Sequence, residues 1–341
     1  AGFSINWPAG LLPAGAVVDV RHKTFDMSLS RSPKTVESED ASRDRHLRYL
    51  EAYREGRILR TTVVVPIYNA YDAVKDCLAS LEKNLSEGVV ALLVNDCSTD
   101  IRIEGLLEQY TAKPQFRVHH NAVNMGYTRS VNNAIGMCPD SDVILLNSDT
   151  VVTRRWLENL RYCAYSDLKV ATVTAFSDNA GAFSMPEIGM YNPVPDGVTQ
   201  EQFALAITNA GEGRLLEVPT GNGFCMFIRR DVIKAIGTFD EERFPRGYGE
   251  ENDFCMRALR QGWKNIVCDK AYVFHKRSQS FQGEKAQLME AGACAVDAAF
   301  PEYRLLTQRF RDAEFSLVRS QARSVLQSRA LREALPRAMY V

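Results

Sequence analysis

Apolar and polar positions form a repeating order of blocks that predicts strands and helices in alternation. Residues 61–66 are a continuous β-branched run, which is typical of a strand buried on both faces of a parallel sheet. The following residues, 72–85, have the apolar spacing of a helix. The same reading predicts strands at 61–66, 89–95, 116–119, 142–146, 170–175, 223–229 and 266–273, and helices at 72–85, 103–110, 128–137, 156–162, 231–236 and 251–261. This order indicates β-α-β units and an α/β fold with a mostly parallel central sheet flanked by helices.

The segments on either side of this alternating block have a different character. We predict a central domain at 59–281, between an N-terminal appendage at 1–58 and a C-terminal helical extension at 282–341. The appendage reads as the end of a preceding domain followed by a helix. Within it we expect a strand at 16–20, a loop at 28–40 and a charged helix at 41–55.

One stretch inside the predicted domain lacks a periodic pattern. Residues 177–217 are rich in Gly, Pro, Asn and Met, so we expect a long loop region there. Loops of this length in compact domains often serve as lids or binding loops. We therefore expect this region to shape a binding groove.

Composition narrows the class of protein. The 341 residues are 45% hydrophobic and 24% charged, which is ordinary for a globular protein with a real core. The formal net charge of −1 gives no general attraction to nucleic acid, so we expect no nucleic-acid partner. No apolar run approaches the roughly 20 residues of a membrane-spanning helix, and the start does not resemble a signal peptide.

The eight cysteines are scattered and form no C-x-x-C pair. A disulfide-rich secreted domain and a structural zinc site both fit this pattern badly. We therefore expect a reducing, cytoplasmic setting, with peripheral association at the inner face of a membrane left open. The chain lacks an initiator methionine, which favours a piece of a longer, multidomain polypeptide.

Four polar clusters follow predicted strands, at 66–69, 95–100, 124–127 and 147–149. Each cluster alone reads best as a turn or a helix cap, because Asp and Asn favour both. Parallel strands place their carboxyl ends at one edge of a sheet, where such folds bind ligands. The convergence of four clusters at one edge therefore favours a binding site.

The sharpest of these clusters is Asn147-Ser148-Asp149, directly after a buried strand. A hard divalent cation takes oxygen ligands and keeps positions open for substrate phosphates, which one or two carboxylates can provide. The competing interpretation is a capped turn before a helix at 154–161, and on the tripeptide alone that interpretation is favoured.

Acidic residues also crowd the start of the helix predicted at 251–261. Glu250, Glu251 and Asp253 lie within four positions, behind a glycine-flanked segment. Acidic first turns are common because they complement the helix dipole, but a crowded carboxylate can also act as a general base. Glu251 and Asp253 point in different directions on a helix, so we expect one to face a substrate while the other anchors the helix. His275 ends the last strand, where a lone histidine is more often structural.

Several common motifs do not occur in the sequence. Gly221, Asn222 and Gly223 could let backbone amides approach a ligand, but they form neither a Rossmann nor a P-loop fingerprint. A G-x-S-x-G elbow and an H-E-x-x-H motif are also missing from the chain. Dehydrogenase, P-loop ATPase, esterase and zinc-protease readings therefore lose their main support.

Taken together, these stretches resemble glycosyltransferase family 2, the inverting enzymes with a GT-A nucleotide-diphospho-sugar transferase fold. The matching stretches are Val-Val-Val-Pro-Ile-Tyr-Asn (63–69), Val-Asn-Asp-Cys-Ser-Thr-Asp (94–100), Asn-Met-Gly-Tyr (124–127), Leu-Leu-Asn-Ser-Asp-Thr (145–150), Gly-Asn-Gly-Phe-Cys-Met-Phe-Ile-Arg-Arg (221–230), Gly-Tyr-Gly-Glu-Glu-Asn-Asp-Phe-Cys-Met-Arg (247–257) and Val-Phe-His-Lys (273–276). Their order and spacing agree over about residues 60–281.

The resemblance implies a metal-assisted transfer from a UDP-, dTDP- or GDP-linked sugar to a hydroxyl of a glycan or lipid-linked glycan. It places Asp149 and His275 at a Mn²⁺ or Mg²⁺ ion and Glu251 at the general base, with Glu250 and Asp253 nearby. It places the nucleotide against Pro66, Tyr68, Asn69, Asp96, Asn124, Gly126, Asn132, Asn147, Ser148 and Asp149. It places Gly221, Asn222 and Gly223 on the side of the acceptor or the donor sugar.

Two positions depart from the family pattern. Asn147 replaces the first acid of the D-x-D metal motif, so metal binding rests more on Asp149 and His275. The base position carries glutamate where many relatives have aspartate. Asn is still a fair oxygen ligand and Glu a fair base.

Two other readings stay open. Nucleotidyl transfer onto a sugar phosphate can use a similar α/β plan, but it usually needs a Gly-rich, basic loop after the first strand. A degenerate transferase domain that only binds carbohydrate or acts as a scaffold is the second. Retention of Asp96, Asp149, Glu251 and His275 argues against decay.

Overall fold

The structure is a computed structural model. It describes residues 39–56, 60–211, 215–276 and 282–313, together with the short strands β1 (Val17–Val18), β2 (Arg21–His22), β3 (Met27–Ser28) and β4 (Lys34–Thr35). In these residues no helix combines the length and the apolar character needed to cross a bilayer.

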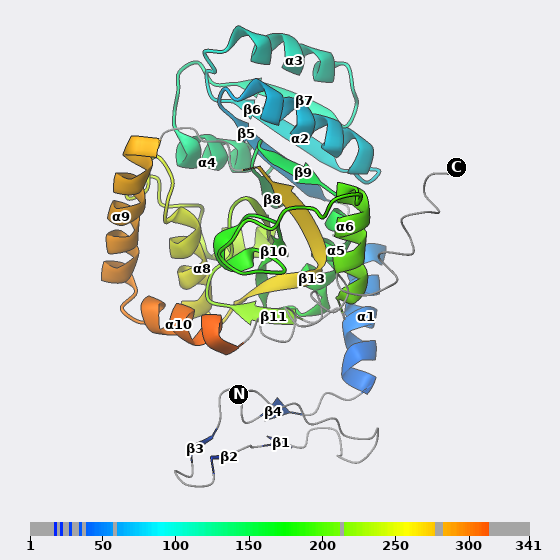
Figure 1. Cartoon of the computed structure of the whole chain (residues 1–341), viewed down its shortest axis with the longest axis vertical. Helices are drawn as coiled ribbons and strands as arrows, with labels where there is room; N and C mark the ends of the chain where they lie inside the picture. Colours follow the sequence, from blue (N-terminus) through cyan, green and yellow to red (C-terminus); the bar gives the residue numbers. More distant parts are fainter. Residues whose placement is uncertain are drawn as a thin grey trace.

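Strands and helices alternate through most of the described chain, as the sequence predicts (Figure 1). The longer strands are β5 (Thr61–Ile67), β6 (Val90–Asn95), β7 (Phe116–His120), β8 (Asp142–Leu146), β9 (Thr150–Val152), β10 (Val170–Phe176), β11 (Leu215–Val218), β12 (Cys225–Ile228) and β13 (Lys264–His275). The helices are α1 (Glu39–Arg54), α2 (Tyr71–Asn84), α3 (Ile101–Thr111), α4 (Tyr127–Met137), α5 (Trp156–Ser166), the 3₁₀ turn η1 (Gly181–Phe183), α6 (Gln200–Ala210), α7 (Arg230–Ile236), α8 (Glu250–Arg260), α9 (Gln282–Ala299) and α10 (Tyr303–Ala313).

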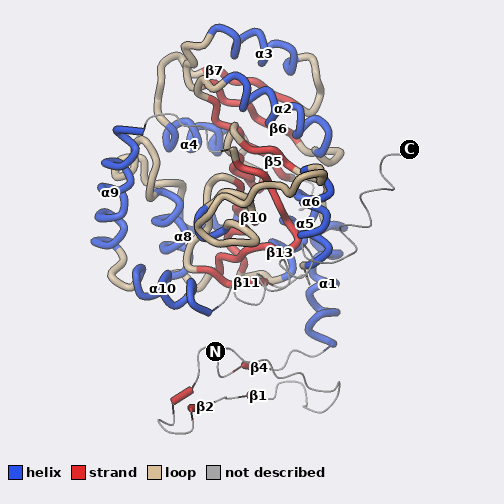
Figure 2. Tube along the Cα trace, viewed as in Figure 1, coloured by secondary structure: helices blue, strands red, loops and turns tan. Residues whose placement is uncertain are grey.

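A nine-stranded sheet forms the centre of the described chain, with helices on both faces (Figure 2). Its strand order is β11-β13-β10-β12-β8-β5-β6-β7, and β9 pairs with β13 outside this order. Successive residues of β5 and β6 bury alternate sides, so that Val63 packs toward α2 and α5 while Val64 packs toward α4 and α8. Each fully buried side chain of this size contributes roughly 1.5–3 kcal/mol through removal from water.

The sheet is mixed, and six of its nine strands, β5, β6, β7, β8, β10 and β13, run in one direction, so that it is mostly parallel as predicted. Strands β7, β6, β5 and β8 are mutually parallel, and β10 is parallel to β13. Strand β12, however, is antiparallel to both β8 and β10, while β9 and β11 are antiparallel to β13. An apolar run shows that a strand is buried on both faces but does not give its direction. The α/β class and the flanking helices are confirmed.

The expectation of a continuous loop at 177–217 is wrong for its second half, where α6 forms and β11 begins. A capping box starts α6, because Thr199 Oγ1 accepts from Gln202 N at 3.2 Å and Gln202 Oε1 accepts from Thr199 N at 2.9 Å. The T-x-x-Q spacing is a sequence signal for a helix start. The first half, apart from η1, is irregular as expected.

The helix of the predicted N-terminal appendage packs on the central domain. Arg48 Nε donates to Ser166 O at 3.1 Å, and the rings of Tyr49 and Tyr162 are 5.1 Å apart. Within the loop expected at 28–40 the structure describes β4 and the start of α1, and within the strand expected at 16–20 it describes β1; most other residues of both segments lie outside the described part of the chain. Two-residue strands leave no periodicity to detect.

The C-terminal extension is helical as predicted over its described part, and α9 lies alongside α8 (Figure 1). Phe244, Met256, Val296 and Phe300 form a small apolar cluster between these helices. Arg260 adds an ion pair with Glu302 at 2.9 Å. Helices α9 and α10 are therefore packed against the domain that carries the candidate site.

Candidate functional site

The carboxyl ends of β5, β6, β7 and β8 lie at one edge of the sheet, because these four strands are parallel. All four polar clusters named above follow these strand ends. The convergence predicted from the sequence is therefore confirmed at the level of the backbone, and the side chains show what each cluster does.

Asp96 fastens the loop that precedes α4. Its buried carboxylate, 4% exposed, accepts hydrogen bonds from Asn121 Nδ2 at 2.9 Å, Met125 N at 2.8 Å and Gly126 N at 2.9 Å. Asn124 Nδ2 donates to the Asp96 carbonyl at 3.2 Å. Carboxylates accept such bonds strongly, so Asp96 shapes this edge of the sheet by holding the loop.

Asn69, which follows β5, also fixes a loop at this edge. Its Oδ1 accepts from Thr99 N at 2.8 Å and Asp100 N at 2.9 Å, which joins the β5 and β6 loops. Asp100 is the N-cap of α3, as the turn interpretation expects, whereas Gly126, not Asn124, occupies the N-cap of α4. Tyr68 is 36% exposed at the same edge.

Asp149 and His275 lie together because β9 pairs with the end of β13. His275 is opposite Thr150 in this antiparallel pair, and Lys276 N donates to Asp149 O at 2.9 Å. The Asp149 carboxylate and the His275 imidazole are 3.2 Å apart, between Oδ1 and Nε2, and both side chains are mostly buried. Phe224 stacks on the His275 ring at a centroid distance of 5.3 Å.

This pair can contribute two ligands to a divalent ion. Ligand atoms on adjacent positions of an octahedral ion at about 2.1 Å lie about 3.0 Å apart, close to the 3.2 Å between Asp149 Oδ1 and His275 Nε2. Within the described residues no group of three or more His, Cys, Asp or Glu side chains is arranged to hold a metal. The other positions of such an ion would be open to oxygen atoms of a substrate and to water, as is usual for Mg²⁺.

Asp178, which the sequence reading did not single out, supports the histidine. It follows β10, is buried, and its Oδ1 accepts from His275 N at 2.8 Å and from Ser177 Oγ at 3.1 Å. Burial raises the pKa of Asp178. A search for carboxylates just after buried strands, the rule used for the other strand ends, would have identified Asp178.

Glu250 and Glu251 begin α8. Glu251 Oε1 accepts a hydrogen bond from Gly223 N at 3.1 Å. The backbone amide of this glycine therefore lies directly against the proposed base. Glu250 is 3% exposed, and its Oε2 has no hydrogen-bond partner among the described residues. Burial, followed by the charge of Glu251, raises the pKa of Glu250 well above its usual range.

Tyr127, the first residue of α4, lies beside the same glycine as Glu251 and was also missed as an individual residue. A Cβ added to Gly223 would lie 3.0 Å from Glu251 Oε1 and 3.1 Å from the Tyr127 hydroxyl. Burial is the largest cause of the raised pKa of Tyr127, and the charges of Glu250, Glu251 and Asp149 add to it. Tyr127 and Glu251 therefore both border the position of Gly223.

Two residues that were predicted to lie in the site form structural hydrogen bonds instead. Asp253 is 2% exposed and accepts from Arg243 Nη1 at 3.1 Å and Arg257 Nε at 2.7 Å, so it anchors α8. Asn132 Nδ2 donates to Phe239 O at 2.9 Å, and its Oδ1 accepts from Phe239 N at 3.1 Å. Asp253 is thus the anchoring partner of Glu251, and Asn132 links α4 to the segment before α8.

Gly221 and Gly223 permit close contacts that a side chain would block. A Cβ at Gly221 would lie 2.6 Å from Met226 Sδ and 2.7 Å from Thr174 Oγ1. Asn222 N donates to Thr174 Oγ1 at 3.1 Å. The loop is therefore fixed on β10 and β12, with Gly223 turned to Glu251.

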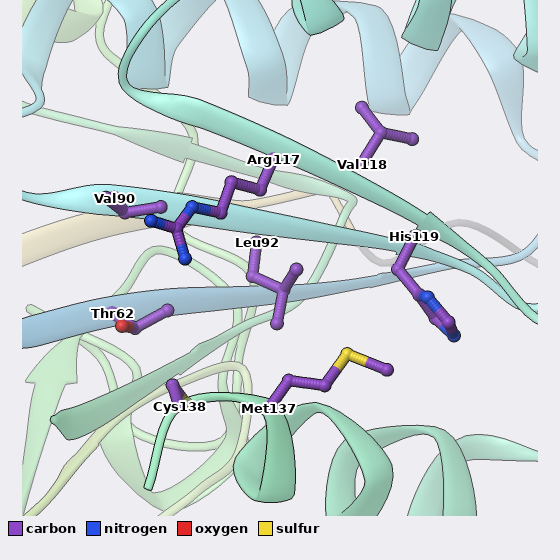
Figure 3. A pocket seen from close by; sticks show the side chains of 8 residues that line it. All are labelled: Thr62, Val90, Leu92, Arg117, Val118, His119, Met137 and Cys138. Atoms are coloured by element: carbon purple, nitrogen blue, oxygen red, sulfur yellow. The ribbon is translucent and has the colours of Figure 1, made fainter. Parts of the chain in front are cut away.

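A hollow of about 220 Å³ lies away from these residues, on β5, β6, β7 and the end of α4 (Figure 3). Its lining is Thr62, Val90, Leu92, Arg117, Val118, His119, Met137 and Cys138. Thr62 and Val90 lie in the first two residues of their strands, so the hollow extends toward the opposite edge from the polar clusters. None of the candidate site residues lines it.

Comparison with known proteins assigns the family. The family model described as Glycosyl transferase family 2 matches residues 62–237, more than half of the chain. The chain belongs to glycosyl transferase family 2. The matched residues include the ends of β5 to β8 and Asp149, and stop before Glu251 and His275.

Solved structures show that this family 2 chain has the GT-A fold. It is similar to Staphylococcus aureus TarS 1–349 in complex with UDP-GlcNAc, with 17% identity, a TM-score of 0.51, and coverage of 80% of this chain and 77% of that chain. It is also similar to the mannosyltransferase PcManGT from Pyrobaculum calidifontis, solved with GDP-Man and Mn²⁺, with 14% identity, a TM-score of 0.50 and 88% coverage of both chains.

Curated relatives carry glycosyltransferase names. Residues of this chain are 24% identical to "Glycosyltransferase GlyA" of Streptococcus pneumoniae over 164 residues, which is 44% of this chain and 23% of the relative. They are 30% identical to "Uncharacterized glycosyltransferase YibD" of Escherichia coli over 119 residues, 34% of each protein. The chain therefore matches only about a quarter to a third of these relatives' length.

The buried carboxyl of Glu250 makes a prediction for stability against pH. Its raised pKa means that the folded state keeps a proton that the unfolded state loses above about pH 4.3. Stability from this group is therefore present at low pH and lost as the pH rises toward the raised pKa. Glu250→Gln cannot ionise, so we expect its melting temperature to exceed that of the wild type increasingly from pH 5 to pH 9.

The measurement is thermal unfolding of both proteins across this pH range. Glu108→Gln, an exposed change in α3, is the matched control and should show no pH-dependent difference. A constant difference between Glu250→Gln and wild type at every pH would contradict the buried, protonated state of Glu250.

Proposed function

We propose that this chain is an inverting, metal-assisted glycosyltransferase that moves a sugar from a nucleoside-diphosphate donor to a hydroxyl of a glycan or lipid-linked glycan. The observation that supports it best is that two successive residues join the two sides of the site: Gly223 N donates to Glu251 Oε1 at 3.1 Å, and Phe224 stacks on the imidazole of the Asp149–His275 pair. Family membership and the curated relatives' names agree with transferase chemistry.

Glu251 is the proposed general base. Gly223 N fixes one of its oxygens, and Asp253 anchors the same helix through two arginines. Glu251 would take the proton of the acceptor hydroxyl while the hydroxyl oxygen bonds to the anomeric carbon and the bond to the diphosphate breaks. Attack from the face opposite the leaving group inverts that carbon.

The raised pKa of Glu250 suits this role. Two adjacent ionised carboxylates in a buried site repel each other, and burial together with the charge of Glu251 raises the pKa of Glu250. The protonated form of Glu250 is thereby favoured, which disfavours a second buried anion beside the proposed base.

Asp149 and His275 would hold Mn²⁺ or Mg²⁺, with Asp178 fixing the backbone of the histidine. The bound ion would neutralise charge on the departing nucleoside diphosphate. Two of the similar structures, PcManGT and GalNAc-T7, were solved with Mn²⁺. Asn147 and Ser148 lie between β8 and this pair and would contact the donor.

The nucleotide would lie against Pro66, Tyr68 and the loop that Asp96 fastens. UDP-, dTDP- and GDP-linked donors all remain candidates; the similar structures contain UDP, UDP-GlcNAc and GDP-Man. The acceptor would approach from the side of Gly223 and the irregular first half of 177–217. A cytoplasmic site of action, with peripheral contact to a membrane, stays a prediction.

The test is release of nucleoside diphosphate from a panel of UDP-, dTDP- and GDP-sugars, with Mn²⁺ or with EDTA. We expect turnover of at least one donor with Mn²⁺ and a loss of at least about tenfold with EDTA. The anomeric configuration of the product, read by NMR, should be opposite to that of the donor. Binding of none of the donors, or equal turnover with EDTA, would contradict the proposal.

A further inference from the structure

Helix α9 touches the loop that leads into the proposed base. Gly292 is buried, and a Cβ added there would lie 1.6 Å from Tyr248 O and 2.8 Å from Tyr248 C. Real Cβ atoms essentially never approach other atoms closer than 3.0 Å. On the other side of the contact, a Cβ on Gly249 would lie 3.3 Å from Gly292 O. Backbone therefore meets backbone, and residue 292 must be glycine for this contact.

The contacted loop needs external support. Gly247, Tyr248 and Gly249 all have positive φ, at 92°, 67° and 140°. For Tyr248 this conformation is strained, because the Cβ of an L-residue crowds its own backbone there. Such conformations persist only when the surroundings fix them. Phe244 fills one side of the loop, 2.5 Å from a Cβ built on Gly249, and Gly292 closes the other.

The same loop sets the first turn of α8. Gly249 is the N-cap of that helix, and Glu250 and Glu251 are its first two residues. Any displacement of the Tyr248 backbone is therefore passed directly to both carboxylates. A misplacement of about 1 Å can cost about a hundredfold in rate.

Helix α9 is itself held in place. Val296 lies one turn after Gly292 and is buried in the cluster with Phe244 and Met256. Arg260 of α8 stacks on Phe300 at 4.5 Å from the ring centroid. Figure 1 shows α9 running along the flank of α8, outside the sheet that carries the metal-side residues.

We propose that Gly292 is a positioning residue for the transfer reaction: through its backbone contact, helix α9 fixes the Tyr248 loop and so aims Glu251 at the acceptor hydroxyl. This inference rests on the proposed function, because it assigns no chemistry to Gly292 itself. It makes the C-terminal extension a part of the catalytic unit. Donor binding at Asp149 and His275 does not depend on the contact.

The test compares Gly292→Ala with Gly105→Ala. Both add one methyl group to a helical glycine, but nothing lies within 4 Å of a Cβ at Gly105. We expect Gly292→Ala to lower kcat by about 10- to 100-fold, with the Kd of the Mn²⁺–nucleoside diphosphate complex within about twofold of wild type. Gly105→Ala should match wild type in both.

Hydrogen exchange gives a second readout that is independent of activity. Amides of residues 247–251 should exchange faster in Gly292→Ala than in the wild type. Their exchange should be the same in Gly105→Ala as in the wild type. A Gly292→Ala protein with wild-type kcat and wild-type exchange in this loop would overturn the proposal. This outcome would overturn only the role of Gly292, and not the proposed function, as long as the wild type transfers sugar and Glu251→Gln does not.

Should Gly292→Ala fail to fold, Val296→Ala carries the same test. This change weakens the packing of α9 on the domain without adding atoms near the loop, and it should lower the stability of the protein. At a temperature well below its melting point we expect lower kcat with unchanged nucleotide binding. Wild-type kcat in a Val296→Ala protein of reduced stability would overturn the proposal.

Discussion

Replacing Glu251 with Gln is expected to lower kcat by about 100- to 10,000-fold, the range that a general base supplies. Glutamine keeps the shape of the side chain and can still accept the hydrogen bond from Gly223 N, at 3.1 Å in the wild type. It cannot take a proton from the acceptor. The Kd of the donor in the presence of Mn²⁺ should stay within about twofold, because Asp149 and His275 are untouched.

Glu108→Gln, the exposed change in α3, is again the matched control and should retain full activity. The measurements are single-turnover transfer and calorimetric titration of the donor. A Glu251→Gln protein with more than a tenth of wild-type kcat would remove Glu251 from the role of base. Loss of activity in Glu250→Gln, with Glu251→Gln active, would move the role to Glu250.

The second large effect is expected at the metal side. Asp149→Ala removes one of the two protein ligands proposed for the ion, and we expect Mn²⁺-dependent binding of nucleoside diphosphate to weaken by about tenfold or more. Loss of groups that merely support metal ligands already costs about 10- to 100-fold in affinity. Binding measured in EDTA should be the same for wild type and Asp149→Ala.

Asp140→Ala is the control for this change, since Asp140 is an exposed aspartate in the turn before β8. It should leave the Mn²⁺-dependent part of binding unchanged. Titration curves that coincide for Asp149→Ala and wild type with Mn²⁺ present would refute the metal role of Asp149.

The order of elements and the meeting of the four polar clusters at one edge of the sheet were accessible from the sequence. The β-branched run at 61–66 and the helix spacing at 72–85 reflect local packing, and the structure forms β5 and α2 there. The rule that parallel strands end at one edge brought four polar clusters together. Strand direction was not accessible, because burial on both faces of β12 is the same in either direction.

The pairing of Asp149 with His275 depends on a feature too short to predict. Strand β9 has three residues, too few to show a period, yet its pairing with β13 joins two residues far apart in the sequence. The T-x-x-Q spacing of Thr199 and Gln202, in contrast, is a capping-box pattern that indicates the start of α6.

Assignment of single residues was limited by partners distant in the chain. Asp253 lies among carboxylates that suit catalysis, but it forms ion pairs with Arg243 and Arg257. Asn132 belongs to a family-like stretch, but its amide binds the Phe239 backbone. Sequence spacing places such residues near the site, while only the fold shows which ones face inward.

Crystals grown with Mn²⁺ and the nucleoside diphosphate of the preferred donor test the shared site most directly, through anomalous scattering from manganese. We expect one strong peak within about 2.5 Å of a carboxylate oxygen of Asp149 and of His275 Nε2. The diphosphate should bind the same ion, with Glu251 facing the position of the departing sugar. A peak far from Asp149, or a nucleotide bound away from the carboxyl ends of β5 to β8, would contradict the proposed transferase site.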